Sequence, residues 1–161
     1  MVFIALISIV LLIGIDQLIK LWAINNLANA TMPVHFIKFG NTEVINLSYY
    51  ENTGAAFSIF RDKIYFLIII TSIFLIVGVY LLVTKKIKKP FLVASITLII
   101  AGGAGNLIDR IFRGLVVDYI EIKLFNFAVF NFADCCVVIG AILLLIYTIF
   151  MDKPKKETLN G

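Results

Sequence analysis

The chain is organised around three stretches, which read Gly102-Gly103-Ala104-Gly105-Asn106-Leu107-Ile108-Asp109-Arg110, Val116-Val117-Asp118-Tyr119-Ile120 and Phe130-Asn131-Phe132-Ala133-Asp134. They place three acids and one arginine beside long apolar runs. A charged residue near the middle of a bilayer costs about 2.5–3.5 kcal/mol on insertion scales, so charges next to membrane segments need a reason. We interpret Asp118 and Asp134 as a carboxylate pair that converges at a membrane surface.

The composition indicates an integral membrane protein. Of the 161 residues, 61% are hydrophobic, and the mean hydropathy is +1.04, far above the globular norm of about half apolar residues. The two cysteines, Cys135 and Cys136, are adjacent in the chain, so no disulfide framework is expected. The single histidine, His35, excludes a His-rich metal site and disfavours a Ser-His or Cys-His mechanism.

Four apolar runs are long enough to cross a bilayer, since about 20 apolar residues suffice. We expect a mainly α membrane protein with one domain over residues 1–161 and four transmembrane helices at about 2–24, 64–84, 91–109 and 132–151. The external segments are then about 25–63 and 110–131. A cleaved signal peptide is the alternative for the first run, because Ala28-Asn29-Ala30 resembles a cleavage site. No basic residue precedes that run, which disfavours the alternative.

Lysines predict the orientation of the spans. The segment between the second and third spans is Lys85-Lys86-Ile87-Lys88-Lys89-Pro90, and the tail carries Lys153, Lys155 and Lys156. The positive-inside rule makes this side cytoplasmic. Both termini are then cytoplasmic, and the acids of the carboxylate pair lie near the outer face. The external segments also carry basic residues, so the prediction rests on the higher density of lysines on the cytoplasmic side.

Two external segments, residues 43–50 and 115–122, are rich in β-forming residues. We expect them to form a small extracytoplasmic β-sheet on the outer membrane surface. The segment Asn52-Thr53-Gly54-Ala55-Ala56-Phe57 combines turn residues with an apolar patch. By spacing alone it is an ordinary turn that leads into a short interfacial helix.

Polar and small residues inside the spans suggest helix contacts. Asp16 and Lys20 are four residues apart with the acid first, which is the favoured order for an ion pair on one helix face. A structural ion pair explains Lys20, whereas the role of Asp16 stays open. Gly102, Gly103 and Gly105 allow helix backbones to approach closely in a membrane bundle.

The end of the third span carries four polar side chains on one side of the helix: Asn106, Asp109, Arg110 and Arg113. Arg113 is explained by a side chain that extends to lipid headgroups. Arg110 could do the same, or its guanidinium could hold a carbonyl or carboxylate group in a site.

The two proposed partner acids differ in how well a structural role explains them. Asn131 and Asp134 have the spacing of a helix N-cap and its third residue, so a capping box would explain them. Asp118 interrupts an apolar run, which no capping rule explains.

Two carboxylates about 4 Å apart repel by about 4 kcal/mol at an effective dielectric of about 20, which separates their titrations by about three pKa units. One acid then stays protonated while the other ionises, as acid–base hydrolysis of a peptide requires.

Five blocks in order resemble lipoprotein signal peptidase (signal peptidase II), a family of aspartic peptidases of bacterial inner membranes. The blocks are Asp16-Gln17-x-x-Lys20, Asn52-Thr53-Gly54-Ala55-Ala56-Phe57, Gly105-Asn106-x-x-Asp109-Arg110, Val116-Val117-Asp118 and Asn131-Phe132-Ala133-Asp134. The resemblance implies that Asp118 and Asp134 are the catalytic dyad. The substrate-binding residues that it implies are Asn52, Gly54, Asn106, Arg110 and Asn131. The supporting or structural residues are Asp16, Lys20, Asp109 and Ala133.

The resemblance also implies a reaction. The substrate would be a prolipoprotein whose lipobox cysteine carries diacylglycerol, and the cut would fall immediately before that cysteine. The expected partners are lipidated prolipoprotein signal peptides and membrane lipid, with no metal, no cofactor and no nucleic acid, and the expected protein is a monomeric, multi-pass protein of the bacterial cytoplasmic membrane. The alternative function is a small four-span transporter or channel that uses its membrane-embedded acids.

Overall fold

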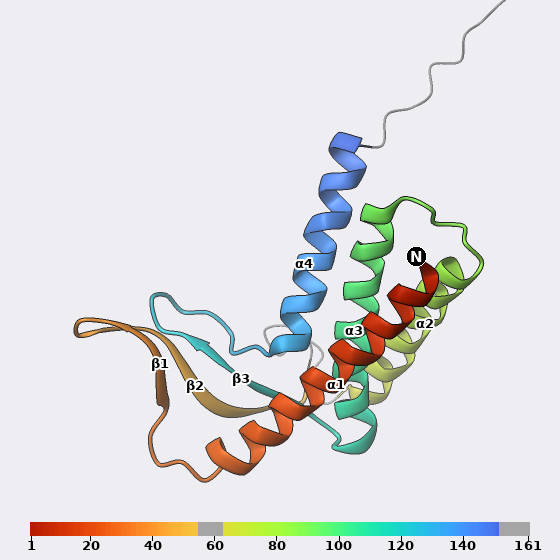
Figure 1. Cartoon of the computed structure of the whole chain (residues 1–161). Coiled ribbons are helices and arrows are strands. Elements are labelled where there is room, and N and C mark those ends of the chain that lie inside the picture. The colour runs from red at the N-terminus through yellow and green to blue at the C-terminus, as the bar shows by residue number, and fades with distance from the viewer. Residues whose placement is uncertain (55–62, 152–161) are drawn as a thin grey trace, which may run out of the picture.

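Four long helices and a three-stranded sheet make up the described part of the chain (Figure 1). The computed structural model describes residues 1–54 and 63–151. In chain order the elements are α1 (Val2–Leu27), β1 (Val34–Phe39), β2 (Thr42–Asn52), α2 (Ile64–Val83), α3 (Pro90–Phe112), β3 (Val116–Ile122), α4 (Phe132–Ile146) and the π-helical turn η2 (Tyr147–Met151). The interfacial helix expected after residue 54 falls on residues 55–62, outside the described residues.

The helices confirm the four predicted spans, since each is long and apolar enough to cross a membrane when η2 is counted with α4. α3 begins at Pro90, whose fixed φ angle suits the first turn of a helix. It continues slightly beyond the predicted end and stops at Phe112. Gly114 follows with a φ angle of +74°, a conformation that glycine adopts without strain, and this residue turns the chain into β3.

α3 lies at the centre of the helical bundle, because it packs against α1, α2 and α4. In its most apolar stretch 44% of residues are buried, compared with 11–17% in the other three helices. The outer faces of α1, α2 and α4 expose large apolar side chains, among them Phe3, Phe74 and Leu145. Exposed apolar surface of this extent is typical of helices that face lipid.

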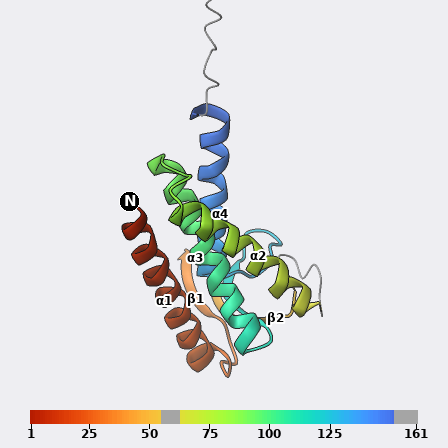
Figure 2. The same cartoon turned by 90° about the vertical axis from the view of Figure 1, so that its right-hand side faces the viewer.

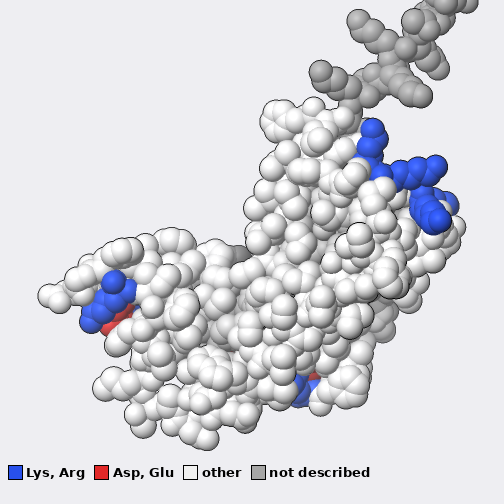
Figure 3. All heavy atoms as spheres, in the orientation of Figure 1, with Lys and Arg blue, Asp and Glu red and all other residues white. Residues whose placement is uncertain are grey.

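The polar surfaces lie at two ends of the molecule. The start of α1, the connection between α2 and α3, and the last turn of α4 lie at one end, and the sheet lies at the other (Figures 1 and 2). On the face drawn in Figure 3, charged side chains gather toward these ends, and the surface between them is uncharged. This distribution fits a chain whose helices cross a bilayer.

The sheet is antiparallel, with the strand order β1-β2-β3. β2 and β3 confirm the two predicted strands. β1 was not expected; it pairs with β2 through a two-residue connection, in which Gly40 has a φ angle of +57°. A Gly-Asn pair between two segments rich in β-forming residues is a hairpin signal, so this strand could have been found from the sequence.

The sheet is attached to the bundle by a buried apolar cluster in which Ala23 and Leu27 of α1 contact Val117 and Tyr119 of β3. Side chains alternate between the two faces of a strand. Because Val117 and Tyr119 are packed in this cluster, Asp118 projects to the other face of β3, toward the start of α4.

Close packing of α3 against α4 leads to a first prediction. A Cβ atom at Gly140 would lie 2.7 Å from the Ser95 carbonyl oxygen and 2.8 Å from Cγ1 of Ile99, so Gly140→Ala forces α3 and α4 apart. We expect a loss of about 1–3 kcal/mol in unfolding free energy, which is the usual range for overpacking. The measurement is the thermal unfolding midpoint of the purified protein in detergent.

Gly14→Ala in α1 is the matched control, because a Cβ atom there meets nothing within 4 Å. Its unfolding midpoint should stay the same or rise slightly, since alanine favours a helix over glycine by up to about 1 kcal/mol. Equal midpoints for the two variants would contradict the close packing of α3 on α4.

Candidate active site

Asp134 belongs to a capping box at the start of α4. Asn131 is the N-cap residue, and its Oδ1 accepts a hydrogen bond of 3.0 Å from the backbone N–H of Asp134. In return, Oδ2 of Asp134 accepts a 3.1 Å hydrogen bond from the backbone N–H of Asn131. The other carboxylate oxygen, Oδ1, accepts a 2.7 Å hydrogen bond from Nδ2 of Asn106 on α3. The capping role expected from spacing is confirmed. It uses only one carboxylate oxygen of Asp134, so the other oxygen can join a larger polar cluster.

Asp118 is buried in the middle of β3, with 3% of its surface exposed. Its Oδ1 accepts a 2.7 Å hydrogen bond from Nδ2 of Asn131, and its Oδ2 accepts one of 2.9 Å from Nδ2 of Asn52. Burial raises the pKa of Asp118 to about 6, and the negative charge of Asp134 adds to the rise, whereas the hydrogen bonds from Asn52 and Asn131 act in the opposite direction.

Two side-chain amides connect the two acids. Nδ2 of Asn131, which donates to Asp118, also lies 3.1 Å from Oδ1 of Asn106. Nδ2 of the same Asn106 donates to Asp134. Asp118 and Asp134, sixteen positions apart in the sequence, therefore belong to one hydrogen-bonded cluster, to which β3, α3 and α4 contribute.

Both acids line a cavity of 590 Å³ at the end of the helical bundle that meets the sheet. Asn52, Asn106 and Arg110 are the other polar or charged residues of its lining. The remaining wall is mainly apolar and is formed by Val116, Ile122, Phe127, Ala128, Val129, Phe130, Cys135, Val137, Val138 and Ile139. Asn131 does not belong to this lining and is fully buried, so its amide contacts the acids rather than the cavity.

Arg110 connects the cavity to the turn after β2. One of its terminal nitrogens, Nη2, donates a 3.0 Å hydrogen bond to the carbonyl oxygen of Gly54. The backbone N–H of Gly54 donates to Oδ1 of Asn52 over 2.9 Å. The turn expected at residues 52–54 is therefore present, and it orients the Asn52 amide so that its NH₂ group faces Asp118. The part of this motif from Ala55 to Phe57 lies outside the described residues.

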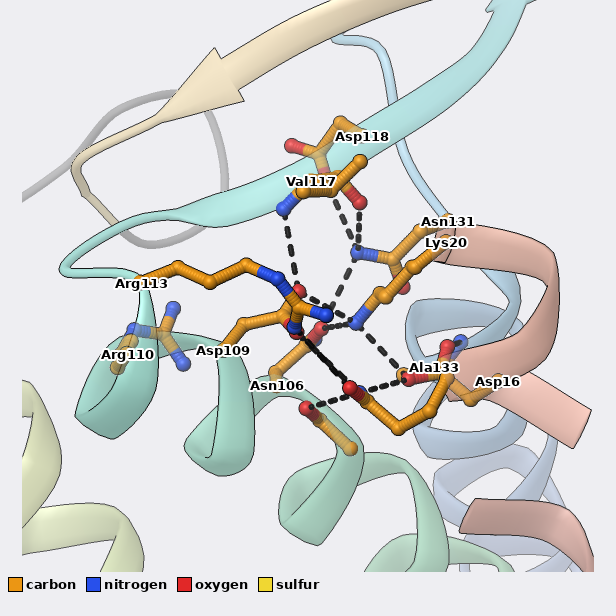
Figure 4. Close-up of polar contacts among 12 residues, drawn as sticks. Asp16, Lys20, Asn106, Asp109, Arg110, Arg113, Val117, Asp118, Asn131 and Ala133 are labelled. Carbon is orange, nitrogen blue, oxygen red and sulfur yellow. Dashed lines mark hydrogen bonds and ion pairs between the residues drawn. The ribbon is translucent and has the colours of Figure 1, made fainter. Parts of the chain in front are cut away.

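A buried ionic cluster of Asp16, Lys20 and Asp109 lies next to Asn106 (Figure 4). Nζ of Lys20 is 2.9 Å from Oδ2 of Asp16 and 3.0 Å from Oδ2 of Asp109. The expected Asp16–Lys20 pair is thus confirmed, with a second acid in addition. Arg113 pairs with Asp109 and donates a 3.0 Å hydrogen bond to Oε1 of Gln17. The expectation that Arg113 extends to lipid headgroups is therefore wrong, because its guanidinium is held by a buried acid.

The two acids of this cluster also hold backbone groups of the site. Oδ1 of Asp16 accepts a 3.0 Å hydrogen bond from the backbone N–H of Ala133. Oδ2 of Asp109 accepts one of 3.2 Å from the backbone N–H of Val117. Asp16 thus fixes the residue before Asp134, and Asp109 fixes the residue before Asp118. The contact of Asp16 joins α1 to the first turn of α4.

Gln17 is a member of the cluster that the sequence reasoning left without a role. Its Nε2 lies 3.2 Å from Oδ2 of Asp16, from the Gly105 carbonyl oxygen and from Oδ1 of Asp109. No local pattern indicates the contacts with Gly105 and Asp109, because they join positions 88 and 92 residues apart. Gly105 permits them, since a Cβ atom there would lie 2.5 Å from Oδ2 of Asp16.

Comparison with known proteins gives one consistent result. Residues 8–150 match the family model described as signal peptidase (SPase) II. The chain is 40% identical to the lipoprotein signal peptidase of Clostridioides difficile (strain 630) over 149 residues, which cover 92% of this chain and 96% of that relative. It is 37% identical to the lipoprotein signal peptidase of Streptococcus pneumoniae (strain ATCC BAA-255 / R6) over 153 residues, which cover 95% and 93%.

A solved structure has the same fold. The structure of a bacterial membrane enzyme, determined by the in meso method at 2.3 Å resolution, matches with a TM-score of 0.77 and 32% sequence identity, covering 95% of this chain and 93% of that one. The family match contains all five sequence blocks, from Asp16 to Asp134. The chain therefore belongs to the signal peptidase II family, the lipoprotein signal peptidases.

Proposed function

We propose that this protein is a membrane aspartic endopeptidase that removes signal peptides from prolipoproteins, with Asp118 and Asp134 as its catalytic dyad. The observation that carries the proposal is the pair of acids, connected by two amides, in the lining of a largely apolar cavity. Membership of the signal peptidase II family supports the same reaction.

The chemistry needs one proton shared by the two acids. The ionised carboxylate takes a proton from a water molecule, whose oxygen attacks the carbonyl carbon of the scissile peptide bond. The protonated carboxyl donates its proton to the carbonyl oxygen. The tetrahedral intermediate then collapses and the C–N bond breaks. The acid that took the proton of water gives it to the leaving nitrogen, and the other acid takes a proton back from a hydroxyl of the intermediate, which restores the shared proton. The proton belongs to the pair, and the burial of Asp118, with the charge of Asp134 beside it, raises the pKa of Asp118.

The proposed substrate carries diacylglycerol on its lipobox cysteine, and the cut falls immediately before that cysteine. Two acyl chains hold such a cysteine at the membrane interface, so the scissile bond stays at that depth. The position of the cavity supports this proposal. Asp134 lies in the first turn of α4 and Asp118 lies in the sheet, so both are near the boundary between helices and sheet.

We propose that the site faces the outside of the cytoplasmic membrane and that both termini lie in the cytoplasm. The support is the positive-inside rule applied to the connection between α2 and α3, which carries Lys85, Lys86, Lys88 and Lys89. The sheet and the start of α4, which carry Asp118 and Asp134, lie at the opposite end of the bundle from this connection (Figure 1). We also propose that residues 1–161 act as one domain and as a monomer, since both acids and the cavity lining of one chain already make a complete site.

The test uses purified protein reconstituted in liposomes with two versions of one precursor, with and without diacylglycerol on the lipobox cysteine. We expect release of the signal peptide from the lipidated version and a much slower release from the other. Mass spectrometry of the products gives the position of the cut. The proposal fails if the purified protein leaves the lipidated precursor intact or cuts at another bond.

Asn52→Leu is expected to move the pH dependence of the enzyme. Asn52 donates a hydrogen bond to Asp118, which stabilises the ionised carboxylate and lowers its pKa. Loss of the donor raises the pKa of Asp118 further, so its proton is kept to higher pH. We expect the basic limb of kcat/KM to shift upward by about one pH unit, since a hydrogen bond to a charged group contributes about 1.5–3 kcal/mol.

Asn26→Leu is the control for this shift, because Asn26 is exposed near the end of α1 and donates only to the Trp22 carbonyl oxygen among the described contacts. Its pH profile should coincide with that of the wild type. A basic limb that stays in place or moves to lower pH in Asn52→Leu would show that this amide does not stabilise the ionised form of Asp118.

A further inference from the structure

Lys20 is the least accessible cation of the described residues, with none of its surface exposed. Burial of an ammonium group is costly unless its donors are all satisfied. The three N–H groups of Lys20 have three acceptors: Oδ2 of Asp16 at 2.9 Å, Oδ2 of Asp109 at 3.0 Å and Oδ1 of Asn106 at 2.8 Å. The first two contacts are ion pairs, and the third joins the cation to an amide that contacts the dyad.

The contact with Asn106 is not required for charge balance. Asp16 and Asp109 carry two negative charges, and Lys20 and Arg113 carry two positive charges, so the cluster is neutral without any amide. Charge balance therefore does not account for the contact with Asn106, which satisfies the third N–H group of the ammonium and at the same time reaches an amide of the dyad. The geometry of the amide itself provides an explanation.

The amide of Asn106 has one orientation that suits its neighbours. Its Oδ1 accepts from Nζ of Lys20 and, over 3.1 Å, from Nδ2 of Asn131. Its Nδ2 donates to Oδ1 of Asp134 over 2.7 Å. An ammonium group has donors and no acceptor. If the amide were rotated by half a turn, its NH₂ group would face the ammonium group and its oxygen would face a carboxylate.

We propose that Lys20 is a positioning residue of the dyad, because its ammonium group fixes the Asn106 amide so that the NH₂ side faces Asp134. The proposal rests on the proposed peptidase function. Lys20 does not line the cavity, so it acts through Asn106 and not on the substrate. Figure 4 shows Lys20 directed at Asn106 from α1, on the side of the amide away from Arg110.

The test is a double-mutant cycle between Lys20→Met and Asn106→Leu, read as kcat and KM on a lipidated precursor. Lys20→Met should lower kcat at least about ten-fold with KM nearly unchanged, since displaced catalytic groups slow the chemical step. Asn106→Leu should also lower kcat. If Lys20 acts through Asn106, the double variant has the kcat of Asn106→Leu alone. The proposal would be overturned if the loss of kcat in the double variant were the product of the losses in the two single variants.

A charge-balanced variant allows the same test if Lys20→Met alone fails to fold. Lys20→Met alone leaves two buried acids with less compensation, whereas Lys20→Met combined with Asp16→Asn removes one charge of each sign. The introduced Asn side chain retains an oxygen that can accept from the Ala133 N–H group. The same loss of kcat is expected relative to Asp16→Asn alone, and a kcat equal to that of Asp16→Asn would overturn the proposal.

Arg113→Met is the matched control, because Arg113 pairs with the same Asp109 but has no described contact with Asn106. It should lower the unfolding midpoint and leave kcat within about two-fold of the wild type. Wild-type protein and Asp118→Asn are measured in the same assay. A wild type that does not cleave contradicts the proposed function, whereas a cleaving wild type with independent effects in the cycle contradicts only the role of Lys20.

Discussion

Asp118→Asn and Asp134→Asn are each expected to lower the rate of signal-peptide release about 10³-fold or more. Each substitution removes the ability of one acid to take or give a proton, and a positioned acid or base contributes about 10²–10⁴-fold to the rate. Because the two acids share one proton, neither compensates for the loss of the other. The measurement is the initial rate of cleavage of a lipidated precursor by the purified variants.

We expect both variants to keep the fold of the wild type. In Asp134→Asn the side chain keeps an oxygen that can accept from the backbone N–H of Asn131, so the cap of α4 persists. The unfolding midpoint should therefore change by only a few degrees, which corresponds to about 1 kcal/mol. Glu121→Gln on the same strand as Asp118 is the control, because Glu121 contacts Ser48 and Lys123 away from the dyad. If either Asp variant retained a tenth or more of the wild-type rate, Asp118 and Asp134 could not be the catalytic dyad.

Asn131→Asp is expected to lower activity about 10²-fold at neutral pH while the N-cap of α4 persists. Aspartate and asparagine are about equally good N-cap residues, so the hydrogen bond from the backbone N–H of Asp134 is kept. The NH₂ group of Asn131, however, is replaced by a carboxyl oxygen. That atom would lie 2.7 Å from Oδ1 of Asp118 and 3.1 Å from Oδ1 of Asn106, both of which are acceptors. The change therefore removes a donor of the dyad and adds a third acid.

The pH dependence of Asn131→Asp makes this prediction specific. At low pH the introduced carboxyl is protonated and can donate to Asp118 as the amide did, so part of the activity should return. Asn131→Ala removes both the cap and the donor; it should lose about 1 kcal/mol of stability through the cap and should not recover at low pH. An Asn131→Asp enzyme with wild-type activity at neutral pH would show that the Asn131 amide is not needed between the two acids.

The membrane architecture could be predicted from the sequence because it depends on local composition. Each span is a continuous apolar run, and α3 and α4 begin near Pro90 and Asn131, which are recognisable start signals. β2 and β3 were visible in their β-branched residues. β1 was missed although a Gly-Asn pair separates it from β2, because its alternation is interrupted by shifts in register near Ile37.

The polar contacts of the site could be predicted only in part. Asp118 stood out because an acid interrupts an apolar run, and the Asp16–Lys20 pair followed from helical spacing. The bond from Ala133 to Asp16 joins residues 117 positions apart, and that from Asn52 to Asp118 joins residues 66 positions apart. Neither helical nor strand periodicity relates residues that lie so far apart in the sequence. For Arg113, the ion pair with Asp109 has helical spacing and could have been found from the sequence, whereas the hydrogen bond to Gln17 joins residues 96 positions apart.

The central claim is that Asp118 and Asp134 work with one proton between them. The pH dependence of kcat/KM for wild-type protein on a lipidated precursor tests it most directly, because this quantity reports the acids and bases of the free enzyme. The account predicts a bell-shaped profile whose basic limb reflects the raised Asp118 pKa of about 6. A rate that is constant between about pH 4 and about pH 9, or that changes through a single ionisation, would contradict it.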